Sequence, residues 1–343
     1  MNWRALLIAA SAAAPAVPAA TAQQTDESRP TPVDLIEEEI QVVGQLPGPP
    51  LWKVTKDDHV LWILGTPRLV PNDLLWQSDS VEHALAHSSE YLPSPGVRIA
   101  SPRNPVKAIR GIRKINRIQR IPDNGALEDL LPEDLYRLFS ETRLRYPLKR
   151  DDLERLRPSV AAERLFDSAA HSAGLEAGRT IHLAIDKSAR KHKVKKVRTS
   201  LSERYKDSPL LDSLQEMSAS AERTCLQARL QGLDAQLEAH TRLATAWAEG
   251  DLASLRAHPA GSATDACVST RVALPPEVLS RMESRVWALW LENAERALGS
   301  NDSTFATLPL SELLRPDGPL SWLRQRGYEV LEPDETPPEG QQG

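Results

Sequence analysis

Hydrophobic and polar positions follow two different periods along the chain, and together they predict a mixed fold. The apolar runs at 51–55 and 59–65 flank a polar segment, Lys56 to Asp58, which is the pattern of a β-hairpin. Helical periodicity fills residues 78–88, 133–145, 158–173, 177–192, most of 209–248, and 277–298. Short strand-like runs lie near 117–121, 193–198, 304–309 and 328–332.

The order of these elements predicts the fold class. We expect an α/β (α+β mixed) fold, in which an α-rich single domain surrounds a modest mixed β-sheet. An N-terminal β-hairpin opens the domain. A strand at 304–309, a helix at about 318–326 and a strand at 328–332 close it as a β-α-β unit. The domain is expected over residues 49–332.

Both ends of the chain differ from this pattern. Residues 23–48 are polar, acidic and proline-containing, and indicate a flexible linker, whereas residues 333–343 indicate a disordered tail. Residues 1–22 read as a secretory signal peptide, with Arg4 before a short apolar run and Ala20-Thr21-Ala22 as the cleavage pattern. The expected location is periplasmic or secreted, after cleavage near Ala22. No other apolar run approaches the roughly 20 residues that a transmembrane helix needs.

Composition narrows the function classes. The 343 residues are 41 % hydrophobic and 26 % charged, which is ordinary for a globular protein. The formal net charge is −5, and it becomes −6 when the single arginine of residues 1–22 is removed. This acidic balance argues against a nucleic-acid partner.

Export would place the two cysteines, Cys225 and Cys267, in an oxidising compartment. In an oxidising compartment such a pair is expected to form a disulfide, which would close a loop of roughly 40 residues and contribute about 4 kcal/mol. A thiol nucleophile or half of a metal site is the alternative. Neither cysteine has a nearby histidine or a CxxC partner to favour it.

His83 and His87 are the first candidate metal ligands. They lie four residues apart on a predicted helix, which is the spacing of a two-histidine zinc site. The HExxH order is absent, however, because Glu82 precedes the pair. Val81 and Leu85 define the buried side of this helix, so both histidines are expected to face solvent.

A basic segment at 106–120, "VKAIRGIRKINRIQR", combines regularly spaced apolar residues with cations and no acids. Its period of three suits neither a straight helix nor a strand, and we expect a helix that breaks into a strand near Arg117. One interpretation is weak contact with an anionic surface such as lipopolysaccharide or acidic lipid. The other, favoured by the acidity of the rest of the chain, is a half-buried element with snorkelling side chains. The anion-binding candidates are Lys107, Arg110, Arg113, Lys114, Arg117 and Arg120.

Five segments in order give the chain a resemblance to a known family. They are "PPLWKV…HVLWILGTPRLVP", "LERLRPSVAAERLFDSAAHSAGLEAG", "ARKHKVKKV", "ATAWAEGDLASL" and "TFATLPLSELLRPDGPLSWLRQRGYEV". Together they resemble the TraB/GumN family, within the wider Tiki-like group, over about residues 49–333. No GxSxG, Walker, GxGxxG or EF-hand pattern occurs in the chain.

The resemblance implies a metal-dependent hydrolysis of peptides, with two GxxH histidines and an acidic residue that hold the metal or activate water. The first GxxH pattern falls on Gly65 to Arg68, and the second falls on Pro309 to Glu312. Both histidines are therefore absent from this chain, and the resemblance implies a degenerate member of the family. The expected acidic residue is Glu90, although it lies a few residues early and Pro93 or Pro95 takes the corresponding place.

These replacements change the expected chemistry. Arg68 cannot deprotonate, so it can neither ligate a metal nor act as a base. Pro309 has a fixed φ and no N–H where the family has glycine. Because Arg68 and Glu312 carry opposite charges at converging positions, one hypothesis is an ion pair between them. The alternative is two unrelated surface substitutions.

Three functional hypotheses follow. The first is a pseudoenzyme of the cell envelope that needs no cofactor and binds a peptide, an envelope component or a partner protein. The second is a metalloprotease-like hydrolase with a displaced divalent-metal site that draws on His59, Glu90, His83 or His87. The third is a surface adaptor that works through the basic segment.

Overall fold

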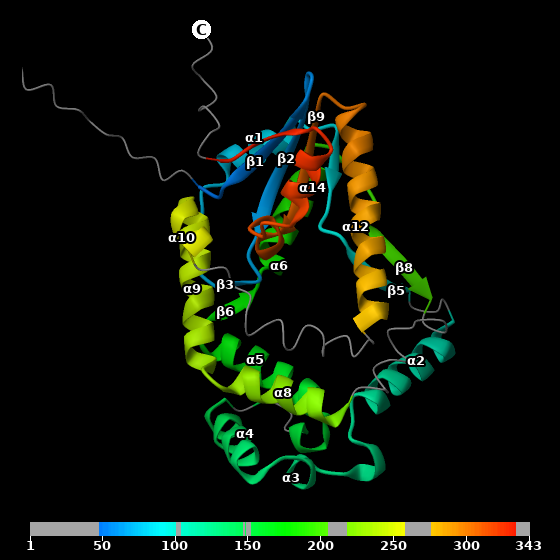
Figure 1. Cartoon of the computed structure of the whole chain (residues 1–343), viewed down its shortest axis with the longest axis vertical. Helices are drawn as coiled ribbons and strands as arrows, with labels where there is room; N and C mark the ends of the chain where they lie inside the picture. The colour runs from blue at the N-terminus through cyan, green and yellow to red at the C-terminus, as the bar shows by residue number, and fades with distance from the viewer. Residues whose placement is uncertain are drawn as a thin grey trace, which may run out of the picture. The chain divides into compact units, whose positions relative to one another are not determined.

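We analysed a computed structural model of the chain, which describes residues 48–100, 104–146, 148, 152–204, 218–257 and 276–333 (Figure 1). The predicted signal peptide, nearly all of the linker and the tail beyond residue 333 lie outside the described residues, as does Cys267. Within the described part, no helix is both long enough and apolar enough to cross a membrane.

The predicted hairpin forms the start of the domain. Strand β1 (Leu51–Lys56) pairs antiparallel with β2 (His59–Thr66) across a turn at Asp57, whose φ of 53° is left-handed. Trp52 and Val54 of β1 are buried while their sequence neighbours are only partly covered, because successive side chains of a strand point to opposite faces. The alternating pattern therefore predicted the hairpin correctly.

The central sheet is mixed and has the order β10-β1-β2-β9-β4-β7. Its other strands are β9 (Ser303–Pro309), β4 (Glu90–Leu92), β7 (Lys195–Lys196) and β10 (Glu329–Leu331). Strand β9 lies parallel to both β2 and β4. Helix α12 (Pro276–Leu298) packs against β2, β4 and β9, and Figure 1 shows it running beside these strands.

The closing β-α-β unit is also present. After β9 the chain forms α13 (Leu310–Leu313) and α14 (Pro319–Gln325) and then enters β10. Since β10 is antiparallel to β1, β1 is antiparallel to β2, and β2 is parallel to β9, β10 and β9 run in the same direction. The predicted unit is confirmed, but its two strands are separated in the sheet by β1 and β2.

Two small sheets extend the fold. Strand β3 (Leu69–Pro71) pairs antiparallel with β6 (Leu175–Ala177), and β5 (Gly96–Ala100) pairs parallel with β8 (Ser200–Arg204). The sequence patterns did not predict these short strands. They depend on partners far away in the chain, which local periodicity does not reveal.

Most of the remaining helices follow the predicted segments, whereas the short helices at 127–130 and 252–257 were not predicted. The remaining helices are α1 (Asp79–Ala86), α2 (Pro105–Ile118), α3 (Leu127–Leu130), α4 (Glu133–Arg145), α5 (Pro158–Ser172), α6 (Arg179–Lys191), α8 (Ala219–Leu230), α9 (Leu233–Glu249) and α10 (Leu252–Ala257). The segment predicted as helical over most of 209–248 divides at Gly232, whose φ of 69° interrupts the helical backbone. In the basic segment the helix continues to Ile118, and Arg120 then forms an isolated β-bridge with Leu156.

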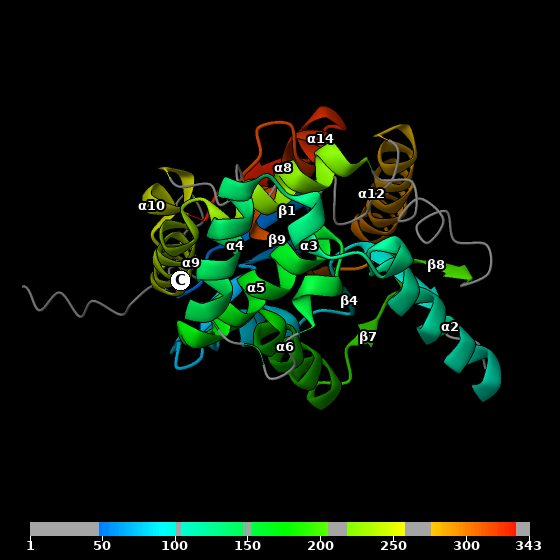
Figure 2. The ribbon, with the colours of Figure 1, turned by 90° about the horizontal axis from the view of Figure 1, so that it is seen from below.

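Buried side chains form three clusters. The largest surrounds the central sheet and includes Trp52, Trp247 and Trp290. A second lies between α3, α4, α5 and α8, which gather together in Figure 2. A small third cluster contains Phe166 and Leu69 and lies beside β3. This third cluster links the end of the hairpin to α5 and α9.

One glycine fixes the backbone that follows β2. Gly178 donates its N–H to the Arg68 carbonyl oxygen at 2.8 Å, and a Cβ at this glycine would collide with the Pro67 carbonyl oxygen. We expect Gly178→Ala to lower the free energy of unfolding by about 1–3 kcal/mol, because a backbone atom cannot move aside as a side chain can.

Urea unfolding measures this effect. Gly96→Ala serves as the control, because the nearest atom to its added Cβ would be Ser200 Oγ at 3.9 Å, an ordinary contact. Equal midpoints for the Gly178 variant and the unchanged protein would contradict the tight approach.

Candidate functional site

The two strands that carry the degenerate motif positions end side by side. In the parallel pairing of β2 with β9, Gly65 lies opposite Leu308 and Thr66 lies opposite Pro309. Thr66 Oγ1 donates to the Leu308 carbonyl oxygen at 3.1 Å. The two strand ends that precede Arg68 and Glu312 are therefore adjacent.

Apolar side chains fill the space next to this edge. A Cβ on Gly65 would lie 2.7 Å from Leu310 Cδ1, 3.1 Å from Leu313 Cδ1 and 3.2 Å from the Trp52 ring. The Gly65 carbonyl oxygen accepts a hydrogen bond from Trp247 Nε1 at 2.6 Å. Both leucines are buried. The backbone at Gly65 therefore faces a packed apolar layer with no room for even one additional methyl group.

Arg68 enters a charged cluster on the helices instead. Its Nη2 lies 3.4 Å from Glu163 Oε2 on α5, and Arg229 of α8 approaches the other carboxylate oxygen, with Nη2 2.6 Å from Glu163 Oε1. Both guanidinium groups lie over the Phe166 ring, with Cζ 5.3 Å from the ring centroid for Arg68 and 4.3 Å for Arg229. We call Arg68, Glu163, Phe166, Arg229 and His240 the arginine cluster.

Burial decides how much these charges matter. The Arg229 side chain is 1 % exposed, Glu163 15 % and Arg68 28 %. A charge removed from water to this extent is stable only with an opposite charge and hydrogen bonds. Glu163 supplies both to Arg229, so its carboxylate is the central group of the cluster.

His240 on α9 completes the cluster from the other side. Its ring centroid lies 6.1 Å from that of Phe166. Burial, together with the positive charges of Arg68 and Arg229, lowers the pKa of His240 to about 4. Its Nδ1 has no hydrogen-bond partner among the described residues. His240 is therefore neutral at pH 7.

Sequence reasoning missed Glu163, Arg229 and His240, although a signal for the last two was present. His240 follows Leu237 and precedes Leu243 at intervals of three, on the buried side of α9. Arg229 lies between buried Leu226 and Leu230 on α8. A polar residue on an apolar helix face indicates a buried polar group that needs a partner.

The predicted ion pair between Arg68 and Glu312 is wrong. Among the ion pairs of the described residues, Arg68 pairs with Glu163, and Glu312 pairs with Arg315 at 3.6 Å. The backbone explains this result. Gly178 holds the Arg68 carbonyl oxygen beside β6, whereas the chain after Pro309 turns at once into α13, which carries Glu312 next to its own Arg315.

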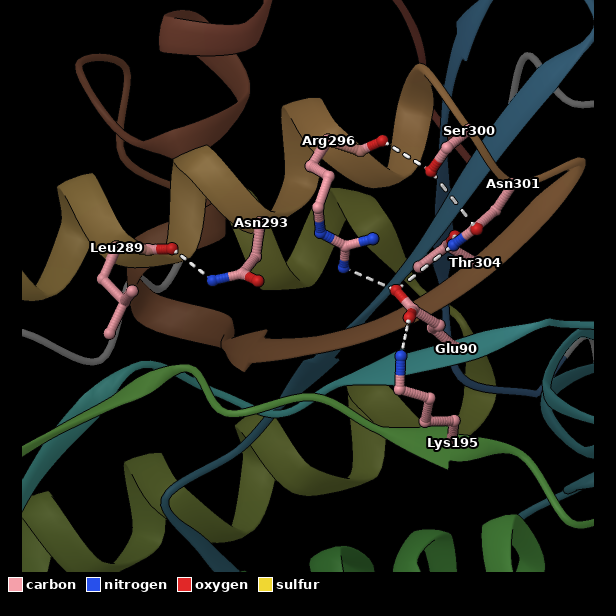
Figure 3. A network of polar contacts seen from close by, with 8 residues as sticks. All are labelled: Glu90, Lys195, Leu289, Asn293, Arg296, Ser300, Asn301 and Thr304. Carbon is pink, nitrogen blue, oxygen red and sulfur yellow. Dashed lines mark hydrogen bonds and ion pairs between the residues drawn. The ribbon is translucent and has the colours of Figure 1, made fainter.

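Glu90 is held at the beginning of β4 by three donors, which Figure 3 shows around its carboxylate. Lys195 Nζ lies 2.8 Å from Oε1, while Arg296 Nη2 lies 2.5 Å and Asn301 Nδ2 3.3 Å from Oε2. Burial raises the pKa of Glu90, but the hydrogen bonds from Lys195, Arg296 and Asn301 outweigh it, so the pKa lies below its ordinary value. The carboxylate is ionised and fully engaged, which is unfavourable for a general base.

Glu90 lies at the opposite edge of the sheet from Gly65 and Pro309. In the register with β9 it lies opposite Thr304, five residues before Pro309, which is about 16 Å along a strand. His59 is at this same amino-terminal edge, where its Nδ1 contacts the Asn301 carbonyl oxygen at 2.8 Å. The segment after β4 lies closer to the strand ends, because Ser94 Oγ donates to the Thr307 carbonyl oxygen at 3.0 Å.

The remaining candidates do not join this edge either. His83 and His87 are exposed on α1, with ring centroids 4.1 Å apart, and the predicted outward orientation is confirmed. Among the described residues, no three His, Cys, Asp or Glu side chains gather to hold a metal ion. At the two positions where the resemblance expects histidine ligands, Arg68 cannot coordinate a divalent metal, and the Glu312 carboxylate pairs with Arg315.

Cys225 is buried on α8, in the second cluster of buried side chains. Its expected disulfide partner, Cys267, lies outside the described residues, so the disulfide stays a prediction.

Comparison with known proteins agrees with the resemblance. The sequence model of the TraB/PrgY/gumN family matches residues 50–331, which is most of the chain. No curated protein and no solved structure matches the chain significantly.

The arginine cluster predicts a large effect of one neutralising substitution. Glu163→Gln leaves Arg229 buried without its carboxylate, so we expect the free energy of unfolding to fall by about 3 kcal/mol. Glu238→Gln is the matched control, because Glu238 forms an exposed pair with Arg242 at 3.5 Å and should change stability by less than about 0.5 kcal/mol. Chemical denaturation compares the two, and an equally small effect of both would refute the central position of Glu163.

His240 predicts a component of acid sensitivity. Its pKa is lowered to about 4 in the folded protein, below the ordinary value of 6.5, so the unfolded chain binds a proton more readily between these values. The contribution of neutral His240 to the free energy of unfolding is fully present above pH 6.5 and is lost as the pH falls toward 4. We expect His240→Gln to flatten the dependence of the unfolding free energy on pH in this window, by up to about 3 kcal/mol.

The control is His87→Gln, at an exposed histidine. Parallel pH curves for the unchanged protein and the His240 variant would show that His240 does not titrate as described.

Proposed function

Because the chain belongs to the TraB/PrgY/gumN family, we propose that it is an exported cell-envelope protein that uses the family scaffold for binding and not for metal-dependent catalysis. The N-terminal signal-peptide pattern supports export. The ligand is a peptide, an envelope component or a partner protein. The first of these corresponds to the peptide hydrolysis that the family resemblance implies. The same location is expected to favour the disulfide between Cys225 and Cys267.

The proposal rests on the packing of side chains at the ends of β2 and β9. At the carboxyl ends of β2 and β9, Leu310 and Leu313 pack against Gly65. A hydrolytic metal site needs neutral imidazole or carboxylate ligands around an open position. The apolar packing at Gly65 argues against such an opening, and the ion pairs of Arg68 and Glu312 engage the side chains that replace the ligands.

The arginine cluster supports the same proposal from a different direction. In it, Arg68 stabilises the fold by sharing Glu163 with a buried arginine. A guanidinium group stays protonated at all physiological pH values, so it does not accept the proton of an attacking water. Where the resemblance expects a histidine that could bind a metal, this chain has Arg68, which forms an ion pair with Glu163.

The competing function is a metal-dependent peptidase with a displaced site. Its candidate residues are divided between the amino-terminal edge of the sheet, with His59 and Glu90, and the exposed surface of α1, with His83 and His87. Lys195 and Arg296 already neutralise the Glu90 carboxylate. The geometry therefore favours the binding function.

Metal analysis combined with peptide cleavage tests the proposal. We expect less than about 0.1 equivalent of zinc or manganese in the purified protein, because the positions of the family ligands offer no set of donors for one. Cleavage of a mixed peptide library should stay at the background rate with and without a chelator. Stoichiometric bound metal or chelator-sensitive cleavage would overturn it, and Glu90→Gln and His83→Ala would then show which candidate residue takes part.

A further inference from the structure

Helix α2 exposes three large apolar side chains, Val106, Ile109 and Ile112. The exposed fraction is 56 % for Val106, 51 % for Ile109 and 58 % for Ile112. A half-buried element with snorkelling cations, the interpretation favoured from the sequence, predicts that these side chains are largely covered. These three side chains are instead exposed, whereas Gly111 and Ile118 of the same helix are buried, so α2 is covered on one side only.

The neighbours of α2 account for the exposure. Within the described part of the chain, no other helix or strand makes an extensive contact with α2. Figure 2 shows α2 at the periphery of the described elements, next to the loop that leads from it to α3. Ile118, at its end, is buried and attaches the helix to the body. The side of α2 that carries Ile109 and Ile112 is therefore presented to the surroundings.

Around the helix axis, the cations of α2 lie away from two of its isoleucines, Ile109 and Ile112. With 100° per residue, Ile109 and Ile112 are about 60° apart, and Arg110, Lys114 and Arg117 lie on the other side of the helix. Lys107 and Arg113 extend this basic side, and residues 105–120 contain no acid. Arg120 lies beyond the helix and pairs with Asp152 at 3.4 Å.

The charge of α2 contrasts with that of the whole chain. Five of its 14 residues are Lys or Arg, whereas the chain as a whole has a formal net charge of −5. Such a local concentration of positive charge attracts an anionic surface even when the rest of the protein is mildly repelled.

We propose that α2 lies in the surface of a bilayer that contains anionic phospholipid, with Ile109 and Ile112 at the boundary between headgroups and acyl chains. The exposed cations Lys107, Arg110, Arg113 and Arg117 contact the phosphate groups. A soluble polyanion would satisfy the cations but leave both isoleucines in water, whereas a bilayer provides an apolar phase and negative charge together. This proposal goes beyond the binding function above, and it does not depend on whether the strand ends are catalytic.

Vesicle sedimentation tests the proposal. The naturally processed protein is mixed with vesicles of phosphatidylcholine alone, or of phosphatidylcholine with 30 mol % phosphatidylglycerol, at low and high salt. We expect it to bind the anionic vesicles at low salt, to bind the zwitterionic vesicles at least about tenfold more weakly, and to lose affinity at high salt because the phosphate charges are screened.

Two pairs of substitutions separate the apolar and ionic contributions. Ile109→Ser with Ile112→Ser should weaken partitioning at least about tenfold while all cations are kept. Arg110→Gln with Arg113→Gln should weaken it roughly 30-fold, because each cation contributes a factor of about five near an anionic surface.

Helix α6 offers matched controls. Leu183 is 51 % exposed, and Lys187 and Arg190 are exposed on the same helix. Leu183→Ser, and Lys187→Gln with Arg190→Gln, should leave vesicle binding unchanged. Thermal unfolding of every variant verifies that the substitutions leave the fold intact.

Three results would overturn the proposal. They are equal binding to both vesicle types, α2 variants that bind like the α6 controls, and heparin binding as strong as anionic-vesicle binding and insensitive to the isoleucine substitutions. The last result would assign α2 to an acidic polymer. None of these results bears on metal content or peptide cleavage, so failure here is distinguishable from failure of the proposed function.

Discussion

The parallel pairing of β2 with β9 is the constraint on which the site depends. It joins residues about 240 positions apart, from Val60 opposite Ser303 to Thr66 opposite Pro309. Because hydrogen-bonded register leaves little freedom along a strand, both degenerate motif positions must end at one edge of the sheet. His59 begins β2, and the pairing of β4 with β9 places Glu90 opposite Thr304, so both lie at the other edge. Strand pairing alone thus separates the candidate acid from the positions it was expected to join.

The segments that follow β2 and β9 determine which side chains lie beyond the ends of these strands. After β2, the backbone at Arg68 is hydrogen-bonded to Gly178, and the Arg68 side chain reaches α5 and α8. After β9, the chain turns directly into α13, whose Leu310 and Leu313 pack against Gly65. One connection thus contributes a cation to a helical charge cluster, and the other closes the edge with apolar side chains. The apolar packing at Gly65 stabilises this end of the sheet.

Local sequence patterns predicted much of the fold and little of the site. The hairpin, the long helices and the closing β-α-β unit were predicted correctly, because alternation and helical periodicity act over neighbouring residues. Short strands such as β3 and β6, which pair with each other across about a hundred residues, left no such pattern. The pairing of Arg68 was missed for the same reason, because Glu163 and Arg229 are remote from Arg68 in the sequence.

The sequence by itself determined the fold class and the family resemblance, since residue identity and local periodicity suffice for these. Only the tertiary structure decided where the replacements point, that Glu163 and not Glu312 neutralises Arg68, and that His240 is buried beside two arginines. It also decided that the isoleucines of α2 are exposed. The physical reason is common to these features: charge pairing and burial depend on distances between remote segments, and those distances exist only after the chain has folded.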